Sequence, residues 1–304
     1  MASIQAQLMN QILSLGPKDD PGKPHDYEAE RQSYRNPPPL LPEGVTVTEL
    51  DLNGIHGEKL EKPGNKDIII FYIHGGGFCT GSALQRRELT QYICDKHGYN
   101  CIAIDYRLSP EEKWPAHLED CHKAYLALLD KGYESSKIAF MGESAGGTLV
   151  LSLALLLKED GLPFPCAIAS FSPGTNRAKV YPSYVTNRDS DKMIGHAVDR
   201  AGQFEAVFGT PSPKEAFLRS PLVSPYYGDY TGLPPVFLSA SNTEILYDDA
   251  RMLYEKLKSE GHTAAFDVQE ELCHAYPIFP HIPEAQETIQ KAIDFIAAHS
   301  QNAV

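Results

Sequence analysis

The hydrophobic pattern of the chain alternates between two periods. Short continuous apolar runs rich in β-branched residues are typical of strands buried on both faces of a sheet. Longer segments in which apolar residues recur every three to four positions predict helices. The runs predict strands over residues 68–73, 101–106, 138–141, 166–171, 236–240 and 264–268. The segments between them predict helices over residues 82–97, 115–129, 148–157, 247–260 and 283–299. This alternation indicates an α/β fold with a mostly parallel sheet covered by helices on both faces.

The N-terminal part follows a different pattern. Its apolar residues recur at helical spacing at positions 4, 8, 12 and 15. This spacing predicts an amphipathic helix over residues 3–15, and we expect its apolar face to pack against the rest of the protein. Residues 16–44 contain seven prolines, which indicates irregular chain in the form of a flap or a wrapped arm.

Two further regions complete the pattern. Residues 45–50 and 55–60 alternate like strands and predict an edge hairpin. Residues 174–232 are rich in Pro, Tyr, Gly and Ser and contain one predicted helical piece, over 197–208. The regular alternation is therefore predicted to belong to one domain, over residues 45–173 and 233–304. Residues 1–44 and 174–232 lie outside this alternation.

Charge and composition exclude several classes of protein. The 304 residues are 42% hydrophobic, which is enough for a large core, and the net charge is −13. An acidic surface argues against nucleic acid and anionic membranes as partners. No apolar stretch approaches the roughly 20 residues of a membrane span. The N-terminus lacks the basic and apolar parts of a secretory signal, so we expect a cytoplasmic protein.

The spacing of cysteine and histidine gives no indication of a metal centre. The six cysteines are scattered without a C-x-x-C pair, and in a chain of this kind we expect buried, reduced thiols. His117 and His122 are five residues apart, which is not a spacing that places both on one helix face. The chain also lacks a phosphate-binding G-x-x-x-x-G-K-[ST] loop. We therefore expect neither a metal nor an organic cofactor.

The strongest local motif is G-x-S-x-G at residues 142–146, with Ser144 at its centre. It stands between the predicted strand 138–141 and the predicted helix 148–157, which is the setting of a nucleophile elbow. Such a turn holds the serine in a strained conformation at the start of a helix. The free N–H groups and the dipole of that helix then face an oxyanion formed at the serine.

A glycine-rich turn after the strand 68–73 supplies the second element of acyl-transfer chemistry. The turn is His74-Gly75-Gly76-Gly77. Without side chains, its backbone N–H groups can approach a substrate closely. We predict that the oxyanion hole consists of the N–H groups of Gly75, Gly76 and Ala145, the residue after the serine.

A serine nucleophile needs a base and an acid that orients the base. Position after the last strand favours His274 as the base over the two other C-terminal histidines, His262 and His281. Glu244 follows the strand 236–240 and is the favoured acid. Asp248 is the alternative, although acidic residues in the first turn of a helix also occur for purely structural reasons.

Three motifs together resemble the hormone-sensitive-lipase-like family of α/β-hydrolases. They are HGGGF at 74–78, YRLSPE at 106–111 and GESAGG at 142–147. The resemblance implies an α/β-hydrolase fold and an acyl-ester hydrolase activity. It also implies that residues 45–173 and 233–304 form the catalytic domain and that residues 1–44 and 174–232 form a cap or lid. It also supports Glu244, which stands where the family has the aspartate of its D-P-L-R-D-E acid motif. By the same resemblance Arg107 and Glu111 are structural, and we expect Glu143 to accept hydrogen bonds from nearby backbone.

The predicted function is that of a serine carboxylesterase acting on a small-molecule ester with a short acyl chain. An amide or lactone hydrolase with the same triad remains open, because one triad serves several acyl groups. A silent small-molecule-binding relative also remains open, although such relatives lack the histidine that is present here as His274. The strand 264–268 is a candidate edge for a homodimer.

Overall fold

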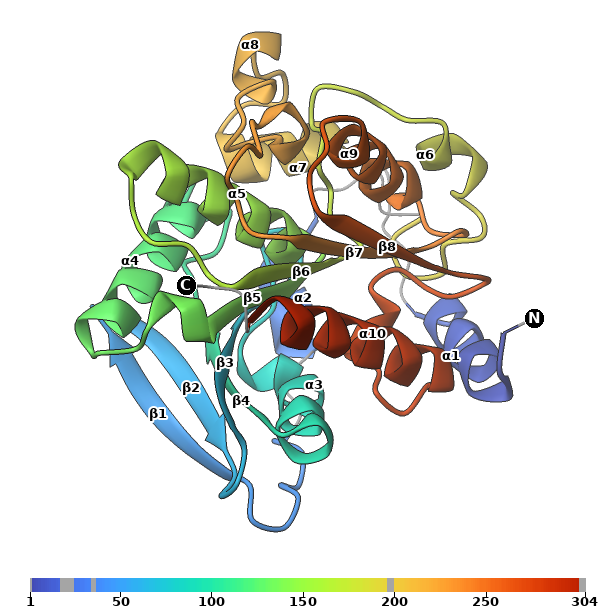
Figure 1. Cartoon of the computed structure of the whole chain (residues 1–304). Helices are drawn as coiled ribbons and strands as arrows, with labels where there is room; N and C mark the ends of the chain where they lie inside the picture. The colour runs from blue at the N-terminus through green and yellow to red at the C-terminus, as the bar shows by residue number, and fades with distance from the viewer. Residues whose placement is uncertain (1, 17–24, 34–36, 196–199, 301–304) are drawn as a thin grey trace.

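A computed structural model describes residues 2–16, 25–33, 37–195 and 200–300. Its strands form a single eight-stranded sheet in the order β1-β2-β4-β3-β5-β6-β7-β8 (Figure 1). The strands are β1 (Thr46–Leu52), β2 (Ile55–Glu61), β3 (Lys66–Ile73), β4 (Tyr99–Ile104), β5 (Ile138–Glu143), β6 (Ala167–Phe171), β7 (Val236–Ser241) and β8 (Ala264–Gln269). β2 pairs antiparallel with both β1 and β4, and all other pairs are parallel. The predicted mostly parallel sheet and edge hairpin are thus confirmed.

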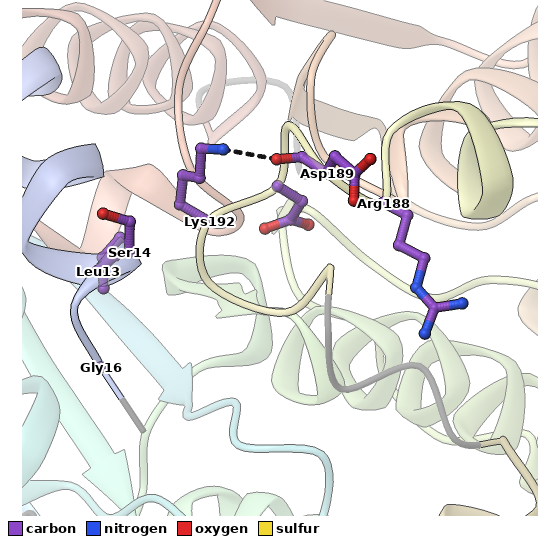
Figure 2. A pocket seen from close by; sticks show the side chains of 7 residues that line it. Leu13, Ser14, Gly16, Arg188, Asp189 and Lys192 are labelled. Atoms are coloured by element: carbon purple, nitrogen blue, oxygen red, sulfur yellow. Dashed lines mark hydrogen bonds between the residues drawn. The ribbon is translucent and has the colours of Figure 1, made fainter. Parts of the chain in front are cut away.

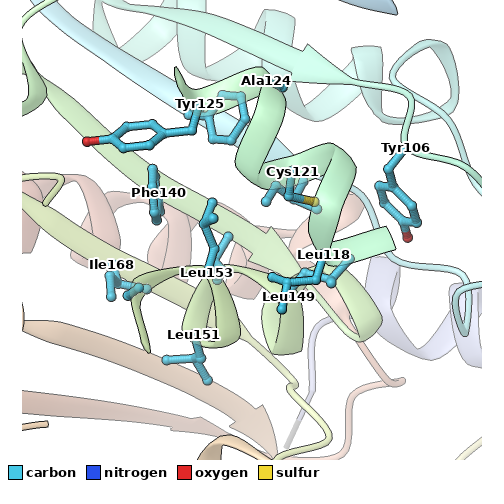
Figure 3. Packing of buried hydrophobic residues seen from close by; sticks show 14 of the residues in the cluster. Tyr106, Leu118, Cys121, Ala124, Tyr125, Phe140, Leu149, Leu151, Leu153 and Ile168 are labelled. Atoms are coloured by element: carbon cyan, nitrogen blue, oxygen red, sulfur yellow. The ribbon is translucent and has the colours of Figure 1, made fainter. Parts of the chain in front are cut away.

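Helices cover both faces of this sheet, as predicted. The α-helices are α1 (Ile4–Ser14), α2 (Tyr27–Ser33), α3 (Arg87–Tyr92), α4 (Ala116–Asp130), α5 (Ala145–Asp160), α6 (Ser183–Thr186), α7 (Arg200–Phe208), α8 (Glu215–Leu218), α9 (Tyr247–Ser259) and α10 (Pro283–Ser300). One apolar core lies between the sheet and α4, α5 and α9, and a second lies between the sheet and α3 and α10. Figure 3 shows side chains of α4 and α5 meeting Phe140 of β5 and Ile168 of β6 in the first core.

Glycines let α5 approach the sheet closely and so position its N-terminus. A Cβ on Gly146 would lie 2.0 Å from the carbonyl oxygen of Ile73, and one on Gly142 would lie 2.6 Å from that of Gly146. Contacts this short leave room only for hydrogen at these positions. The first turn of α5 is therefore held against the ends of β3 and β5, which places Ser144 at the carboxyl edge of the sheet.

The N-terminal helix forms, but its predicted orientation is wrong. The apolar residues that were expected to pack inward are exposed, Ile4 at 73% and Leu15 at 86% among them. α1 instead packs through Ala6, Met9 and Leu13, together with Ala2 before the helix, against the region around the start of α10. Ser3 fixes this orientation, because its N–H and its hydroxyl both donate to the carboxylate of Glu284. This face makes the contact because Ala2 and Ala6 permit a close approach and because the two hydrogen bonds of Ser3 are charge-assisted.

Three other segments differ from the prediction in detail. α2 lies within residues 16–44, which were predicted to be irregular, and Arg31 of α2 donates to Glu111 and to the carbonyl oxygens of Cys79 and Ser109. The helix predicted over 82–97 is divided into a 3₁₀ turn, α3 and a π-helical turn. Of the helix predicted over 197–208, α7 accounts for 200–208, and residues 197–199 lie outside the described part of the chain.

The described residues also bear on the predictions about cysteines, metals and membranes. All six cysteines are buried and unpaired, which confirms the expectation of reduced thiols. Across the described ranges, no group of three or more His, Cys, Asp or Glu side chains is arranged to hold a metal ion. None of the described helices is both long and apolar enough to cross a membrane.

Candidate active site

The predicted site residues converge at the carboxyl edge of the sheet, although they come from four distant parts of the chain. Ser144 follows β5, the glycine turn follows β3, Glu244 follows β7, and His274 follows β8. The carboxyl ends of parallel strands share one edge of a sheet, so their loops meet there. The parallel strand order therefore brings the four predicted site segments to the same edge of the sheet.

Ser144 occupies a strained turn between β5 and α5. Its backbone φ is 54° and its ψ is −120°, a region that residues with a side chain rarely adopt. Its N–H donates to the carbonyl oxygen of Phe171, and its carbonyl accepts from the N–H of Thr148 one turn into the helix. These bonds and the glycine contacts hold the turn in place. The predicted nucleophile elbow thus has the backbone conformation that the motif requires.

His274 and Glu244 form a buried pair. The Nδ1 of His274 donates to Oε2 of Glu244 at 2.8 Å, and both side chains are almost fully buried. The other ring nitrogen, Nε2, is buried and has no hydrogen-bond partner among the described residues. An imidazole oriented in this way presents a free nitrogen that can take a proton from a nucleophile.

The rival candidates lie elsewhere. Asp248 accepts from Arg251 and from the N–H of Ser183, and it makes no hydrogen bond to His274. His281 is half exposed and faces Glu88 at 3.7 Å. His262 is hydrogen-bonded to the carbonyl oxygen of Pro234. Of the alternatives weighed from the sequence, the structure therefore pairs only Glu244 with His274 within the described residues.

The surroundings of His274 favour its protonated form. Burial acts to lower the pKa of the imidazole, but the hydrogen bond to Glu244 and the charge of that carboxylate outweigh burial. The more distant charges of Asp191 and Glu143 act in the same direction. The pKa of His274 is therefore raised above its ordinary value, which strengthens the imidazole as a base.

Glu143, beside the serine, has a role that corrects one part of the prediction. Its Oε1 accepts from the N–H of Gly75 at 2.6 Å and from Nε of Arg86 at 2.6 Å, and its Oε2 accepts from the hydroxyl of Tyr72. The expectation that Glu143 binds nearby backbone is confirmed. The N–H of Gly75 donates to Glu143 and is therefore not free to bind an oxyanion, contrary to the prediction.

The rest of the turn at residues 74–77 and the first residue of α5 have backbone N–H groups without a described partner. The N–H groups of Gly76 and Gly77 make no hydrogen bond within the described residues, and the N–H of Ala145 belongs to the unsatisfied first turn of α5. Gly76 has a φ of +114°, and a Cβ there would lie 2.2 Å from the carbonyl oxygen of Thr80. Glycine is therefore required at this position, and the turn can aim successive N–H groups outward.

Residues of the 174–232 insertion hold the loop that carries Glu244, a role that sequence reasoning missed. The buried carboxylate of Asp191 accepts from the N–H of Ile245, next to Glu244. The Nδ2 of Asn187 donates to the carbonyl oxygens of Asn242 and Glu244. These contacts join segments more than 50 residues apart, and no local motif marks them.

A small cavity lies next to Asp191, away from Ser144. It measures about 120 Å³ and lies between the end of α1 and residues 188–192 of the insertion (Figure 2). Its lining is mostly polar and includes Asp191, but neither Ser144 nor His274 contributes to it. The cavity is therefore separate from the catalytic arrangement.

Arg107 and Glu111 have the structural roles that the resemblance implies. Arg107 donates to both oxygens of Asp120 in α4 and also pairs with Glu119. Glu111 pairs with Arg31 of α2 at 2.8 Å. These pairs tie the loop after β4 to α4 and to the N-terminal arm.

Comparison with known proteins places the chain in a family. Residues 70–278, well over half of the chain, match the family model of the alpha/beta hydrolase fold. The chain belongs to this α/β hydrolase family. Within the family it is grouped with the hormone-sensitive-lipase-like esterases, and it is a carboxylic ester hydrolase.

Individual relatives extend over nearly the whole chain. An acetyl-hydrolase of Streptomyces hygroscopicus is 29% identical over 302 residues, 97% of each chain. An esterase of Acinetobacter venetianus is 28% identical over 84% of each chain. Among solved structures, an esterase from the bacterial hormone-sensitive lipase family superposes with a TM-score of 0.87 at 29% identity, over 99% of both chains. An esterase/lipase from an uncultured bacterium gives 0.88 at 26% identity, over 99% of this chain and 100% of that one.

Proposed function

We propose that the protein is a serine carboxylesterase that hydrolyses short-chain acyl esters through an acyl-enzyme intermediate on Ser144. The observation that carries this proposal is the buried His274–Glu244 pair, in which Nε2 of His274 has no partner among the described residues. The pair follows β7 and β8 at the edge of the sheet where the strained Ser144 follows β5. An acetyl-hydrolase among the relatives and a similar esterase structure soaked with p-nitrophenyl butyrate support a small acyl group.

The reaction has two steps in this proposal. His274 takes the proton of Ser144 as its oxygen attacks the ester carbonyl, and Glu244 stabilises the imidazolium that forms. The oxyanion accepts from the N–H groups of Gly76 and Ala145, with Gly77 in the place predicted for Gly75. His274 then protonates the leaving alcohol, and water repeats the sequence on the acyl-enzyme.

The supporting parts are proposed as well. Residues 45–173 and 233–304 form the catalytic domain, and residues 1–44 with 174–232 form a cap over it. Contacts of Arg31 with the loop after β4, and of Asn187 with the acid loop, are consistent with a cap that is anchored at both ends.

Location and assembly complete the proposal. Six buried, unpaired cysteines fit the reducing cytoplasm. The outer edge of β8, with its partly exposed Val268, is the proposed seam of a homodimer. Cell fractionation tests the first statement. Light scattering of the wild type and of Val268→Lys tests the second, because a wild type that is already monomeric would contradict the seam.

The experiment that tests the catalytic proposal is hydrolysis of p-nitrophenyl esters with two- to twelve-carbon acyl chains. We expect kcat/KM to peak at short chains and Ser144→Ala to lower kcat by at least about 10⁴-fold while remaining folded. Near-native turnover by Ser144→Ala would contradict the assignment of Ser144 as the nucleophile. A peak at long chains would contradict the short-chain preference.

A further inference from the structure

The insertion (residues 174–232) places two arginines beside the proposed active site. Arg177 lies shortly after β6, and Arg200 is the first residue of α7. The chain between β6 and Arg177 is tied to the first turn of α5, because the hydroxyl of Thr148 donates to the carbonyl oxygen of Gly174 at 2.9 Å. Arg177 therefore extends from a segment that is fixed next to the helix of the nucleophile.

A line of partly exposed residues leads from the serine to these arginines. Ser144, Gly76 and Gly77 are partly exposed, whereas the surrounding framework is buried. A Cβ on Gly77 would lie 3.3 Å from Nε2 of Gln203 in α7. The Oε1 of Gln203 in turn accepts from Nη1 of Arg177 at 3.4 Å. A single side-chain amide thus separates the guanidinium from the oxyanion turn.

Neither guanidinium forms an ion pair with any carboxylate in the described ranges. Arg200 donates to the carbonyl oxygens of Arg177 and Asn176 at 3.3 and 3.4 Å, and its buried Nε has no partner there. Both groups lie over aromatic rings, Arg177 over Phe78 at 5.5 Å and Arg200 over Tyr184 at 4.5 Å. Rings support a cation without engaging its in-plane N–H groups, so the donors that Gln203 and the two carbonyl oxygens do not bind have no carboxylate partner among the described residues.

One carboxylate, Asp249, acts on both arginines from a distance. Its Oδ1 accepts from the backbone N–H groups of Thr175 and Asn176. Burial raises the pKa of Asp249 to about 6, although the two arginines oppose the shift. Even when Asp249 is fully ionised, two cations face one anion, so the described groups carry one uncompensated positive charge.

We propose that the substrate is an ester that bears a carboxylate, and that Arg177 and Arg200 bind this carboxylate while Ser144 attacks the ester. This inference rests on the proposed function and names its substrate class. The forked donors of a guanidinium match the two oxygens of a carboxylate. A chain with a net charge of −13 repels anions in general, so an anionic substrate needs a local positive site such as this one.

Two kinds of ester carry this chemistry, and two substrate pairs distinguish them. Monoethyl succinate against ethyl valerate tests a carboxylate on the acyl side. 4-Acetoxybenzoate against its methyl ester tests one on the alcohol side. We expect the wild type to have the lower KM for the charged member of at least one pair. Added NaCl should lower kcat/KM for that member only, because salt screens the attraction.

The variants Arg177→Gln and Arg200→Gln test the residues themselves. Each should raise KM for the preferred charged ester about tenfold, while kcat/KM for its neutral partner changes less than about twofold. Arg219→Gln is the matched control, since Arg219 belongs to the same insertion, is exposed and pairs with Glu215. Thermal melts establish that each variant is folded, and having two variants protects the test against the loss of one.

Two results would overturn the proposal. One is a preference for the neutral member in both pairs. The other is an equal effect of the arginine variants on charged and neutral esters. Calorimetric binding of 4-acetoxybenzoate and monoethyl succinate to Ser144→Ala separates this inference from the proposed function. Binding that needs the arginines supports the site even if the wild type turns over no ester. Absence of binding by both probes, with neutral esters still hydrolysed, refutes the site alone.

Discussion

Arg86 and Arg177 are both close to the glycine turn, yet their surroundings differ completely. Arg86 belongs to the framework beneath the turn, where its Nε donates to the buried carboxylate of Glu143 at 2.6 Å. Arg177 belongs to the insertion and forms no ion pair with a described carboxylate. The framework pairs its charges internally, whereas the insertion leaves a positive charge without a carboxylate partner among the described residues.

This difference suits the framework to fixing geometry and the insertion to binding a ligand. In the framework, Glu143 satisfies the N–H of Gly75, the guanidinium of Arg86 and the hydroxyl of Tyr72 at once. A fully satisfied buried network fixes geometry, as an oxyanion turn requires. In the insertion, long hydrogen bonds and ring contacts leave donors available, as binding requires.

The largest effect is expected where the framework meets the chemistry. Glu244→Gln should lower kcat about 10³- to 10⁴-fold with little change in KM, because the imidazolium loses its partner carboxylate. Steady-state kinetics on p-nitrophenyl butyrate measures both constants. Asp248→Asn is the control and should retain most activity, since Asp248 makes no hydrogen bond to His274. The reverse ranking of the two variants would transfer the acid role to Asp248.

The next effect concerns the contributions of Arg86 and Arg177 to the stability of the protein. Glu143→Gln leaves the mostly buried guanidinium of Arg86, whose side chain is 17% exposed, without its counter-ion and should lower the free energy of unfolding by about 3 kcal/mol. Arg177→Gln should change it by less than about 1 kcal/mol, because no ion pair is broken. Urea unfolding measures both. The double variant Glu143→Gln/Arg86→Met removes the unpaired charge and should recover part of the loss. An equal decrease in the free energy of unfolding for Glu143→Gln and Arg177→Gln would contradict the proposed difference between the framework and the insertion.

The pH dependence gives a third and smaller effect. Neutral His274 is the active base, so kcat/KM is retained at high pH and falls as the pH drops through the pKa of the histidine. Because Glu244 raises this pKa, the acid limb of the wild type should have its midpoint above 6.5. In Glu244→Gln, burial is opposed only by the more distant charges of Asp191 and Glu143, and the midpoint should move down. A midpoint that stays in place would mean that another group controls the limb.

The framework could be predicted from sequence far better than the insertion. The strands and the elbow follow from short-range patterns, and the positive φ of Ser144 follows from its motif. The occupied N–H of Gly75 could not be foreseen, because it depends on where the side chain of Glu143 points. Gln203 and Arg177 meet only through the folded insertion, so no spacing in the sequence marks them. Motifs encode local geometry, and the substrate site depends on contacts between distant segments.

The smallest effect concerns α1, where hydrophobic periodicity predicted the wrong face. Leu8 is 52% exposed and Ala6 only 2%. Leu8→Gln, which keeps a good helix former, should therefore change the free energy of unfolding by no more than about 0.5 kcal/mol. Ala6→Leu forces a larger side chain against Leu272 and Cys273 and should cost about 1–3 kcal/mol.

Urea unfolding of these two variants decides which face carries the contact. A loss above about 1 kcal/mol for Leu8→Gln, with none for Ala6→Leu, would restore the orientation expected from periodicity. The opposite result means that the helix is placed by the face that contains Ala6, Met9 and Leu13 and by the hydrogen bonds of Ser3 to Glu284. The exposed stripe of Ile4, Leu8, Ile12 and Leu15 then contributes little to the stability of the protein.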